Sequence, residues 1–249
     1  MTAPRTGASK PADVPAEILA QLNAGTLATA TLAEGLAIDF AQLLAAVVPE
    51  HSLAVSLADK GIAARMQTVA VALLPYMEEL LPRLRAHPSD TARGWACYMI
   101  GIAPKWKLAA RLAALEPLAD DPHFGVREWA WLAMRPYVVE SVSHFLKAMV
   151  PWAKSPRENL RRFASESTRP RGVWSVHVKQ LVQNPAPALP LLELLRADSS
   201  PYVQNSVGNW LNDAGKSQPA WVREVAGRWR AESACPATDA ILRRALRRL

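Results

Sequence analysis

The chain has 249 residues, a formal net charge of +7, and 50% hydrophobic residues. This hydrophobic share excludes a wholly disordered protein, and the excess of lysine and arginine favours a polyanionic partner such as nucleic acid. The two cysteines, Cys97 and Cys235, form no metal-ligand pattern, so neither a disulfide-rich scaffold nor a metal site is expected.

The chain begins with a stretch rich in Pro, Ser, Thr, Gly and Lys, and we predict a mobile tail over residues 1–13. This start has no apolar core of the kind found in a signal peptide. No apolar run approaches the roughly 20 residues that span a bilayer. These features predict no membrane association and a cytoplasmic protein, associated with the nucleoid if its partner is DNA.

From Pro15 onward, apolar residues recur at helical spacing, first up to a stop at Pro49 and again over Ala63–Leu73 before Pro75. Runs of alternating β-branched residues, which would indicate strands, are absent from the sequence. We therefore predict an all-α fold, with residues 14–249 forming a single domain.

Three helix-like segments repeat. Arg93, Arg127 and Arg161 are each 34 residues apart, and each is followed three residues later by alanine. A further copy has Gln204 in the arginine position, 43 residues beyond Arg161. Periods of 34 to 43 residues with two helices per unit are typical of HEAT-like arrays, so we predict an α-solenoid, curved with a basic concave face.

The most unusual stretch is Arg161–Ser175, which holds four arginines, one carboxylate and one tryptophan. If Leu160–Thr168 is helical, Arg162, Glu166 and Arg169 share one face, and Pro170 ends the helix. The segments Asp120–Tyr137 and Asp198–Asp213 follow the same plan, and Arg135-Pro136 repeats the Arg169-Pro170 ending. A surface cluster of salt bridges is the alternative interpretation.

Any chemistry must depend on carboxylates and aromatic rings. The sequence has no phosphate-binding loop, dinucleotide fingerprint, nucleophile elbow or HExxH zinc motif, and its five histidines are scattered. We expect no cofactor and no metal. The candidate carboxylates are Glu128, Glu166 and Asp213, one on each of the three segments.

At these residues the chain resembles the AlkC/AlkD superfamily of bacterial DNA-alkylation-repair glycosylases, and most closely its AlkC side. Leu160 to Trp174 resemble the family pattern V-R-R-L-A-S-E-G-S-R-P-R-x-x-W. Tyr202 to Asp213 resemble Y-V-R-R-S-V-A-N-H-L-N-D, and Glu128 to Tyr137 resemble a block ending EFAIRPF. The resemblance covers about residues 85 to 249.

The resemblance implies a monofunctional glycosylase that hydrolyses the N-glycosidic bond of cationic alkylated bases in duplex DNA without base flipping. The implied substrates are 3-methyladenine and 7-methylguanine, with 3-methylcytosine as a further candidate. Glu166 would be the leading sugar-facing carboxylate, with Asp213 and Glu128 as its partners. The DNA-contacting residues would be Arg127, Arg161, Arg162, Arg169, Arg171, Trp131, Trp174 and Trp210, and the protein would act on double-stranded DNA as a monomer.

Several departures from the family pattern leave the activity open. Gly172-Val173 replaces Leu-Pro, Gln204-Asn205 replaces an arginine pair, and Trp210 replaces a frequent histidine. One alternative is a non-catalytic HEAT-repeat protein that binds distorted or branched DNA, and another is a scaffold that binds acidic peptides. The basic end RRALRRL fits phosphate contact or a solvated last helix equally well.

Overall fold

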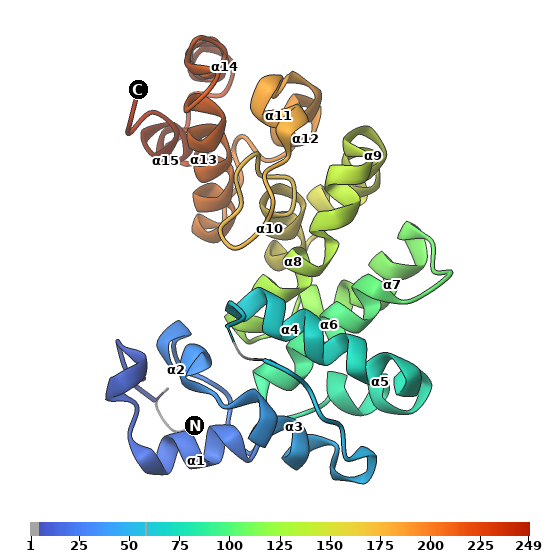
Figure 1. Cartoon of the computed structure of the whole chain (residues 1–249). Helices are drawn as coiled ribbons and strands as arrows, with labels where there is room; N and C mark the ends of the chain where they lie inside the picture. The colour runs from blue at the N-terminus through green and yellow to red at the C-terminus, as the bar shows by residue number, and fades with distance from the viewer. Residues whose placement is uncertain (1–4, 58) are drawn as a thin grey trace. The chain divides into compact units, whose positions relative to one another are not determined.

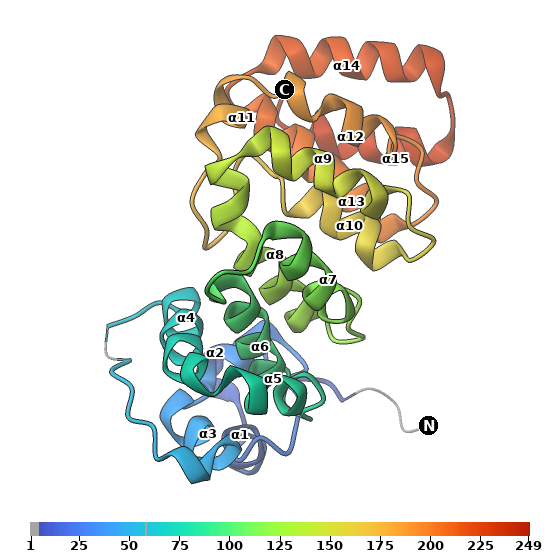
Figure 2. The same cartoon turned by 90° about the vertical axis from the view of Figure 1, so that its right-hand side faces the viewer.

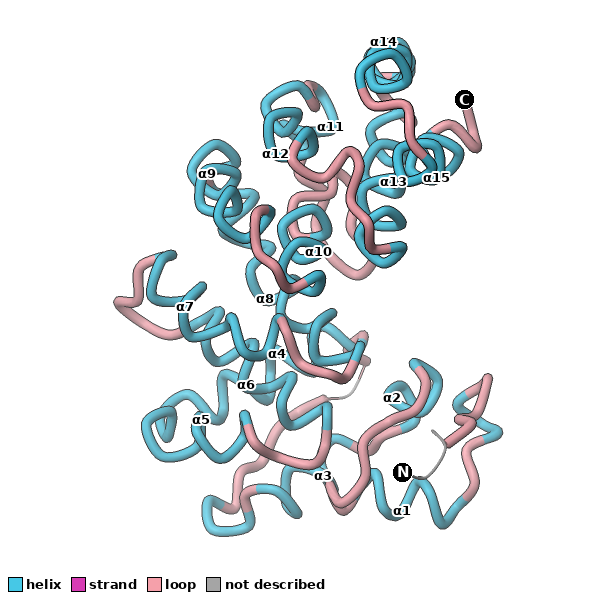
Figure 3. Tube along the Cα trace, turned by 180° about the vertical axis from the view of Figure 1, so that it is seen from behind, coloured by secondary structure: helices cyan, strands magenta, loops and turns pink. Residues whose placement is uncertain are grey.

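The computed structural model describes residues 5–57 and 59–249, and within these residues it contains helices and no strand (Figures 1 and 3). The all-α, HEAT-like fold class predicted from the sequence is confirmed. The α-helices are α1 (Ala16–Asn23), α2 (Leu32–Ala37), α3 (Phe40–Val47), α4 (Ile62–Leu73), α5 (Met77–Arg85), α6 (Asp90–Ile102), α7 (Leu108–Ala119), α8 (Phe124–Glu140), α9 (Val142–Ala153), α10 (Glu158–Glu166), α11 (Lys179–Gln183), α12 (Leu189–Glu193), α13 (Pro201–Gly215), α14 (Pro219–Glu232) and α15 (Pro236–Ala245). None of the helices in the described residues has the length and apolarity needed to cross a membrane.

The chain divides into two compact units, Met1–Ala133 and Met134–Leu249, and α8 runs from the first into the second. The sequence analysis predicted one repeat domain from residue 14 onward. Each unit has its own buried hydrophobic side chains. Figure 2 shows the helices of both units.

In the first unit, α6 packs against α4, α5 and α7. Its glycines allow α8 to approach closely. A Cβ at Gly94 would lie 2.5 Å from Cδ1 of Trp129, and one at Gly101 would lie 2.9 Å from the carbonyl oxygen of Ala133. These two glycines therefore set the α6–α8 distance.

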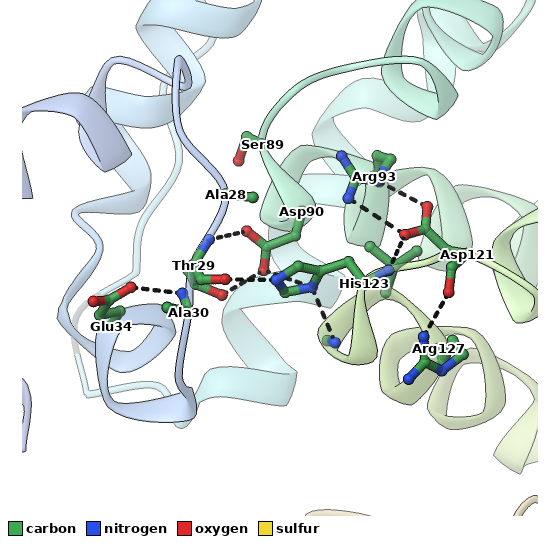
Figure 4. Close-up of polar contacts among 12 residues, drawn as sticks. Ala28, Thr29, Ala30, Glu34, Ser89, Asp90, Arg93, Asp121, His123 and Arg127 are labelled. Atoms are coloured by element: carbon green, nitrogen blue, oxygen red, sulfur yellow. Dashed lines mark hydrogen bonds and ion pairs between the residues drawn. The ribbon is translucent and has the colours of Figure 1, made fainter. Parts of the chain in front are cut away.

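The N-terminal segment of the first unit is held by polar contacts (Figure 4). The backbone N and Oγ1 of Thr29 donate to the Asp90 carboxylate at 2.8 and 2.9 Å, and His123 Nε2 lies 2.6 Å from the Thr29 carbonyl oxygen. Arg5 forms an ion pair with the buried Glu34 at 2.5 Å. Residues 1–4 of the predicted mobile tail lie outside the described residues, whereas Arg5 and Ala8 contact α2 and the segment before it.

In the second unit, α13 is the central helix. It packs against α10, α11, α14 and α15, and α10 in turn packs against α9 and α12. The helix begins where Ser200 accepts a hydrogen bond from the Tyr202 backbone N, with Pro201 in the first helical position. Proline also begins α14 and α15, because a proline at the first position removes no helical hydrogen bond.

The predicted 34-residue period corresponds to a structural period. Arg93, Arg127 and Arg161 are each the fourth residue of their helices, α6, α8 and α10. In each case Nη1 donates to the carbonyl oxygens of the residues six and five positions earlier, at 2.6 to 3.0 Å. Gln204, the fourth residue of α13, donates to the carbonyl oxygen six positions earlier at 2.8 Å. Each of these side chains thus fastens the turn that precedes its own helix.

This arrangement gives two of the expected DNA-contacting arginines a structural role. Arg161 also makes two hydrogen bonds to the Asp198 carboxylate, at 2.6 and 3.0 Å, and Arg127 donates to the carbonyl oxygens of Asp121 and Pro122. Both guanidinium groups therefore stabilise turns, and their contact with DNA phosphates remains a prediction.

Arg161→Ala tests this assignment. It should lower the free energy of unfolding by about 2 to 3 kcal/mol, because it leaves the nearly buried Asp198 carboxylate without its charged partner. Chemical denaturation measures the loss. The exposed Arg230→Ala is the control and should stay within about 0.5 kcal/mol of the parent. An unchanged stability combined with a weaker salt dependence of DNA binding would restore the phosphate role.

Candidate functional site

Two predicted carboxylates meet in the second unit at the packing contact between α10 and α13. Glu166 is the last residue of α10 and Asp213 lies near the end of α13, and both are 4% exposed. The helix predicted over Leu160–Thr168 ends at Glu166, shortly before Pro170. The early end allows Arg169 to turn back toward both acids.

Arg169 bridges the two carboxylates. Its Nη1 donates to Glu166 Oε1 at 2.6 Å, while Nη2 and Nε donate to Asp213 Oδ2 at 2.6 and 2.9 Å. This places both acids against one guanidinium group. Arg162, Glu166 and Arg169 do group together, with Arg162 Nη2 at 3.7 Å from Glu166 Oε2, but Arg169 lies beyond the helix and not on its face.

Further donors complete the surroundings of the two acids. Ser206 Oγ on α13 donates to Glu166 Oε2 at 2.7 Å and itself accepts from Ser165 Oγ at 2.7 Å. Lys216 Nζ donates to Asp213 Oδ1 at 2.8 Å. Each of the four carboxylate oxygens therefore lies within 3.7 Å of at least one donor or cation.

The surroundings keep Glu166 ionised. Burial alone would raise the pKa of its carboxyl group, but the charges of Arg162 and Arg169 and the hydrogen bonds from Ser206 and Arg169 outweigh it, and the pKa lies below its ordinary value. A buried, ionised carboxylate is a suitable group to stabilise a developing positive charge.

The loop that follows Arg169 carries the predicted tryptophan. It is closed by the hydrogen bond from the Val178 backbone N to the Pro170 carbonyl oxygen at 3.0 Å. Trp174 is 47% exposed and has φ of 56°, a left-handed conformation that is uncommon for a bulky residue. Strain of this kind persists only where surrounding contacts impose it, and it is often found at functional sites.

The contacts that hold this loop come from Arg135, which is 2% exposed. Its guanidinium group donates to the carbonyl oxygens of Ser167, Pro170 and Val176 at 2.9, 3.5 and 3.0 Å. Burial lowers the pKa of Arg135 to about 10, which still leaves the group charged at neutral pH. Arg135 thus fastens the backbone on both sides of Trp174.

Two of the three predicted DNA-facing tryptophans are core residues, and we correct their assignment. Trp210 has no exposed surface, and its Nε1 donates to the carbonyl oxygen and Oγ1 of Thr168. Trp131 is 3% exposed, and its Nε1 donates to Glu128 Oε2 at 2.7 Å. A buried indole that satisfies its N–H inside the protein has no ring face to offer DNA.

Glu128 lies in the first unit, whereas Glu166 and Asp213 lie in the second. The structure therefore brings together two of the three predicted catalytic acids, and the partnership of Glu128 with them remains a prediction.

Sequence reasoning missed Ser206, Lys216 and the role of Arg135. The first two gave no signal, because serine and lysine on a helix are ordinary surface residues. Arg135 did give one, in the repeated Arg-Pro pair, but its burial against loop carbonyls was not foreseeable from the pattern.

Outside this site, the first unit contains a cluster of possible metal ligands. Glu50, His51 and Glu79 bring one ligand atom each within 4.8 Å of one another. Arg83 already pairs with Glu50 at 2.5 Å, and His51 stacks on Tyr76. Nε2 of His51 also lies 3.9 Å from Glu50 and 3.5 Å from Glu79, so contacts among the protein's own groups account equally well for this arrangement.

Repeated helices, with two arginine-bridged carboxylates at their packing contact, define the class as a HEAT-like repeat protein with a buried acidic site. The chain belongs to the family of DNA alkylation repair enzymes, whose model matches residues 125–249.

The chain is also similar to solved structures and to one curated protein. The chain is 28% identical to the Pseudomonas fluorescens alkylpurine DNA glycosylase AlkC, bound to DNA containing an abasic site analog, with a TM-score of 0.61 over 77% of this chain and 54% of that chain. AlkD2 from Streptococcus mutans shares the fold, with 22% identity and a TM-score of 0.65 over 82% of this chain and 97% of that chain. The uncharacterized protein YhaZ of Bacillus subtilis (strain 168) is 31% identical over 193 residues, which are 74% of this chain and 52% of that protein. The chain thus spans about half the length of AlkC and of YhaZ.

Glu166→Gln tests the ionised state of the buried acid. Because the pKa of Glu166 is lowered on folding, its carboxylate stabilises the parent above the ordinary value of 4.5, and this contribution is lost as pH falls through the lowered value. The free energy of unfolding should therefore fall more steeply in the parent than in the variant between about pH 6 and pH 3.

Urea denaturation at several pH values measures this difference. Glu224→Gln, which removes an exposed carboxylate of α14, is the matched control and should follow the parent. Parallel curves for all three proteins would show that Glu166 does not titrate in this range differently from an exposed acid.

Proposed function

We propose that this protein is a monofunctional DNA glycosylase that hydrolyses the N-glycosidic bond of cationic alkylated bases in duplex DNA. The observation that carries the proposal is the pair of buried carboxylates, Glu166 and Asp213, bridged by Arg169, with the exposed Trp174 on the loop that follows Arg169. Membership of the DNA alkylation repair family supports it.

The proposed reaction needs few catalytic groups. A base alkylated at N3 or N7 is cationic and leaves as a neutral molecule, so no general acid is required. The remaining tasks are to stabilise positive charge on the sugar and to orient a water molecule, and carboxylates can do both. This sugar-directed mechanism needs no pocket for a flipped base, and 3-methyladenine and 7-methylguanine are the substrates we propose, with 3-methylcytosine a further candidate.

Arg169 has a double role in this proposal. Without DNA, its charge compensates both carboxylates. A DNA phosphate that binds the same guanidinium group would draw positive charge away from the acids and increase their attraction for a cationic sugar. Trp174 would then offer its ring face to the deoxyribose by cation–π attraction.

One observation favours a second function, a non-catalytic protein that binds distorted DNA. Both carboxylates are almost completely buried and already engaged in ion pairs, as expected for acids that only stabilise the α10–α13 contact.

Product analysis separates the two functions. We expect methylated duplex DNA incubated with the protein to release 3-methyladenine or 7-methylguanine, identified by chromatography, without strand cleavage. Glu166→Gln should reduce release at least tenfold, which corresponds to about 1.4 kcal/mol, while DNA affinity stays close to that of the parent. The Glu224→Gln control should keep full activity. Salt-sensitive duplex binding without base release would select the non-catalytic function.

Arg171→Ala tests the proposed phosphate contact. The side chain is half-buried, and its Nε atom has no hydrogen-bond partner among the described residues. Its removal should weaken binding to damaged and undamaged duplex alike and reduce the salt slope of log K by about one. Binding measured by fluorescence anisotropy, with Arg230→Ala as control, gives the slope. A loss confined to damaged duplex would mean that Arg171 reads the lesion.

A further inference from the structure

An apolar groove lies in the first unit, between α5 and the loop that joins α6 to α7. Its volume is about 560 Å³, which falls within the range of about 300 to 1,000 Å³ that is usual for ligand pockets. The unit that contains it holds neither Glu166 nor Asp213. The groove is lined by four apolar residues of the segment 74–82 and by Pro75, Tyr76, Glu78, Glu79, Pro104 and Trp106.

The loop that carries Trp106 has a fixed backbone. Buried Arg111 of α7 donates to two carbonyl oxygens at the end of α6, at 2.6 and 2.8 Å, and to that of Ala103 at 2.6 Å. Two residues after Ala103, Lys105 has φ of 62°, which is uncommon for a residue other than glycine. Such a conformation persists only where the surroundings impose it. Trp106 is therefore presented on a preformed loop.

The two aromatic side chains of the groove have polar ends that are not used within the protein. Trp106 is 36% exposed, and its Nε1 donates no hydrogen bond to the described residues, unlike Nε1 of Trp131 and Trp210. The Tyr76 ring stacks on His51 with centroids 3.8 Å apart, and its hydroxyl has no hydrogen-bond partner in the described part of the chain. Aromatic residues with an apolar ring and a free polar end are typical of interfaces.

The groove is acidic, although the chain has a net charge of +7. Glu78 and Glu79 are the charged residues that line it, and both are exposed. Neither carboxylate forms an ion pair with a lysine or arginine of the described residues. The lysines on either side of Trp106 do not line the groove. A surface of this charge repels a phosphate backbone and attracts a basic segment.

A proline in α5 adds a backbone acceptor. Pro82 has no N–H group, so it cannot donate the helical hydrogen bond to the carbonyl oxygen of Glu78, four residues earlier. Both residues line the groove. The oxygen thus lacks its helical donor, and a basic side chain in the groove can supply one.

We propose that this groove binds a proline-rich segment of a partner protein, with arginine or lysine beside the prolines. Such segments adopt the polyproline II conformation and dock in aromatic-lined grooves, because they are already extended and lose little entropy on binding.

The free donors favour this occupant over a helix. Polyproline II makes no internal hydrogen bonds, so its carbonyl oxygens can accept from Nε1 of Trp106 and from the Tyr76 hydroxyl. A helical segment has most of its carbonyl oxygens occupied by its own N–H groups. Glu78 and Glu79 pair with the basic residues of the segment. The inference is independent of the proposed function and makes the first unit a docking module.

Peptide arrays test the proposed partner chemistry. The full chain is applied to short peptides with a Pro-x-x-Pro core flanked by arginine, and to matched sets with the arginines changed to glutamate or the prolines to alanine. We expect binding to members of the first set that is about tenfold weaker or more in both matched sets. Equal binding to the three sets, or no binding at about millimolar peptide, would overturn the proposal.

Groove variants show where the best peptide binds, with affinity measured by fluorescence anisotropy. Trp106→Ala should weaken binding about tenfold. Glu78→Gln with Glu79→Gln should weaken it about fivefold at low salt. Glu17→Gln with Glu224→Gln removes two exposed carboxylates elsewhere and should leave affinity unchanged. If this control loses as much affinity as the groove variant, only net charge matters and the groove is not the site.

Fluorine NMR of protein labelled with 5-fluorotryptophan gives a second readout. The resonance that is missing from Trp106→Phe belongs to Trp106, and it should shift when peptide is added to the parent. A shift confined to other resonances would place the peptide elsewhere and overturn the proposal. Both measurements are made without DNA, so their outcome is separate from that of the base-release assay.

Discussion

The ion pairs of Arg169 are the constraint on which the second unit depends. This guanidinium group holds Glu166 at the end of α10 and Asp213 on α13, and α13 in turn packs against α11, α14 and α15. Two carboxylates with almost no exposure are tolerable only while a cation compensates them, since an unpaired buried charge costs several kcal/mol. The same pairs that stabilise the helix contact therefore also set the position and ionisation of the proposed site.

The arginines of this chain have two distinct roles, which the sequence alone does not distinguish. Arg93, Arg127 and Arg161 are bound to backbone carbonyls before their helices, and Arg135 is bound to the carbonyls around Trp174. These guanidinium groups stabilise turns, and their N–H groups already donate hydrogen bonds to backbone carbonyl oxygens. Other arginines lie beside a loop or a surface hollow, namely Arg171, Arg243 and Arg247. Fewer arginines are therefore available to bind phosphate than the net charge of +7 suggests.

The fold was largely predictable, and the site was predictable in part. Helical periodicity and proline stops indicated an all-α chain, and the 34-residue spacing of three arginines marked a real structural repeat. The spacing of Arg162 and Glu166 also placed them together, because residues four apart share a helix face, whereas Arg169 reaches Glu166 from beyond the helix end. The ring environments of Trp131 and Trp210 were not predictable, since an aromatic residue beside charges can point to either side of its helix.

The sequence by itself determined the helices, the repeat, the shared helix face of Arg162 and Glu166, and the family. These depend on contacts between residues close in the chain, or on motifs that can be read in order. Only the tertiary structure decided that Arg169 also binds Asp213, that Arg135 holds the Trp174 loop, and that Pro75 and Trp106 border one apolar groove. Each of these arrangements joins residues more than 30 positions apart, and such pairs are selected by how helices pack rather than by the local order of residues.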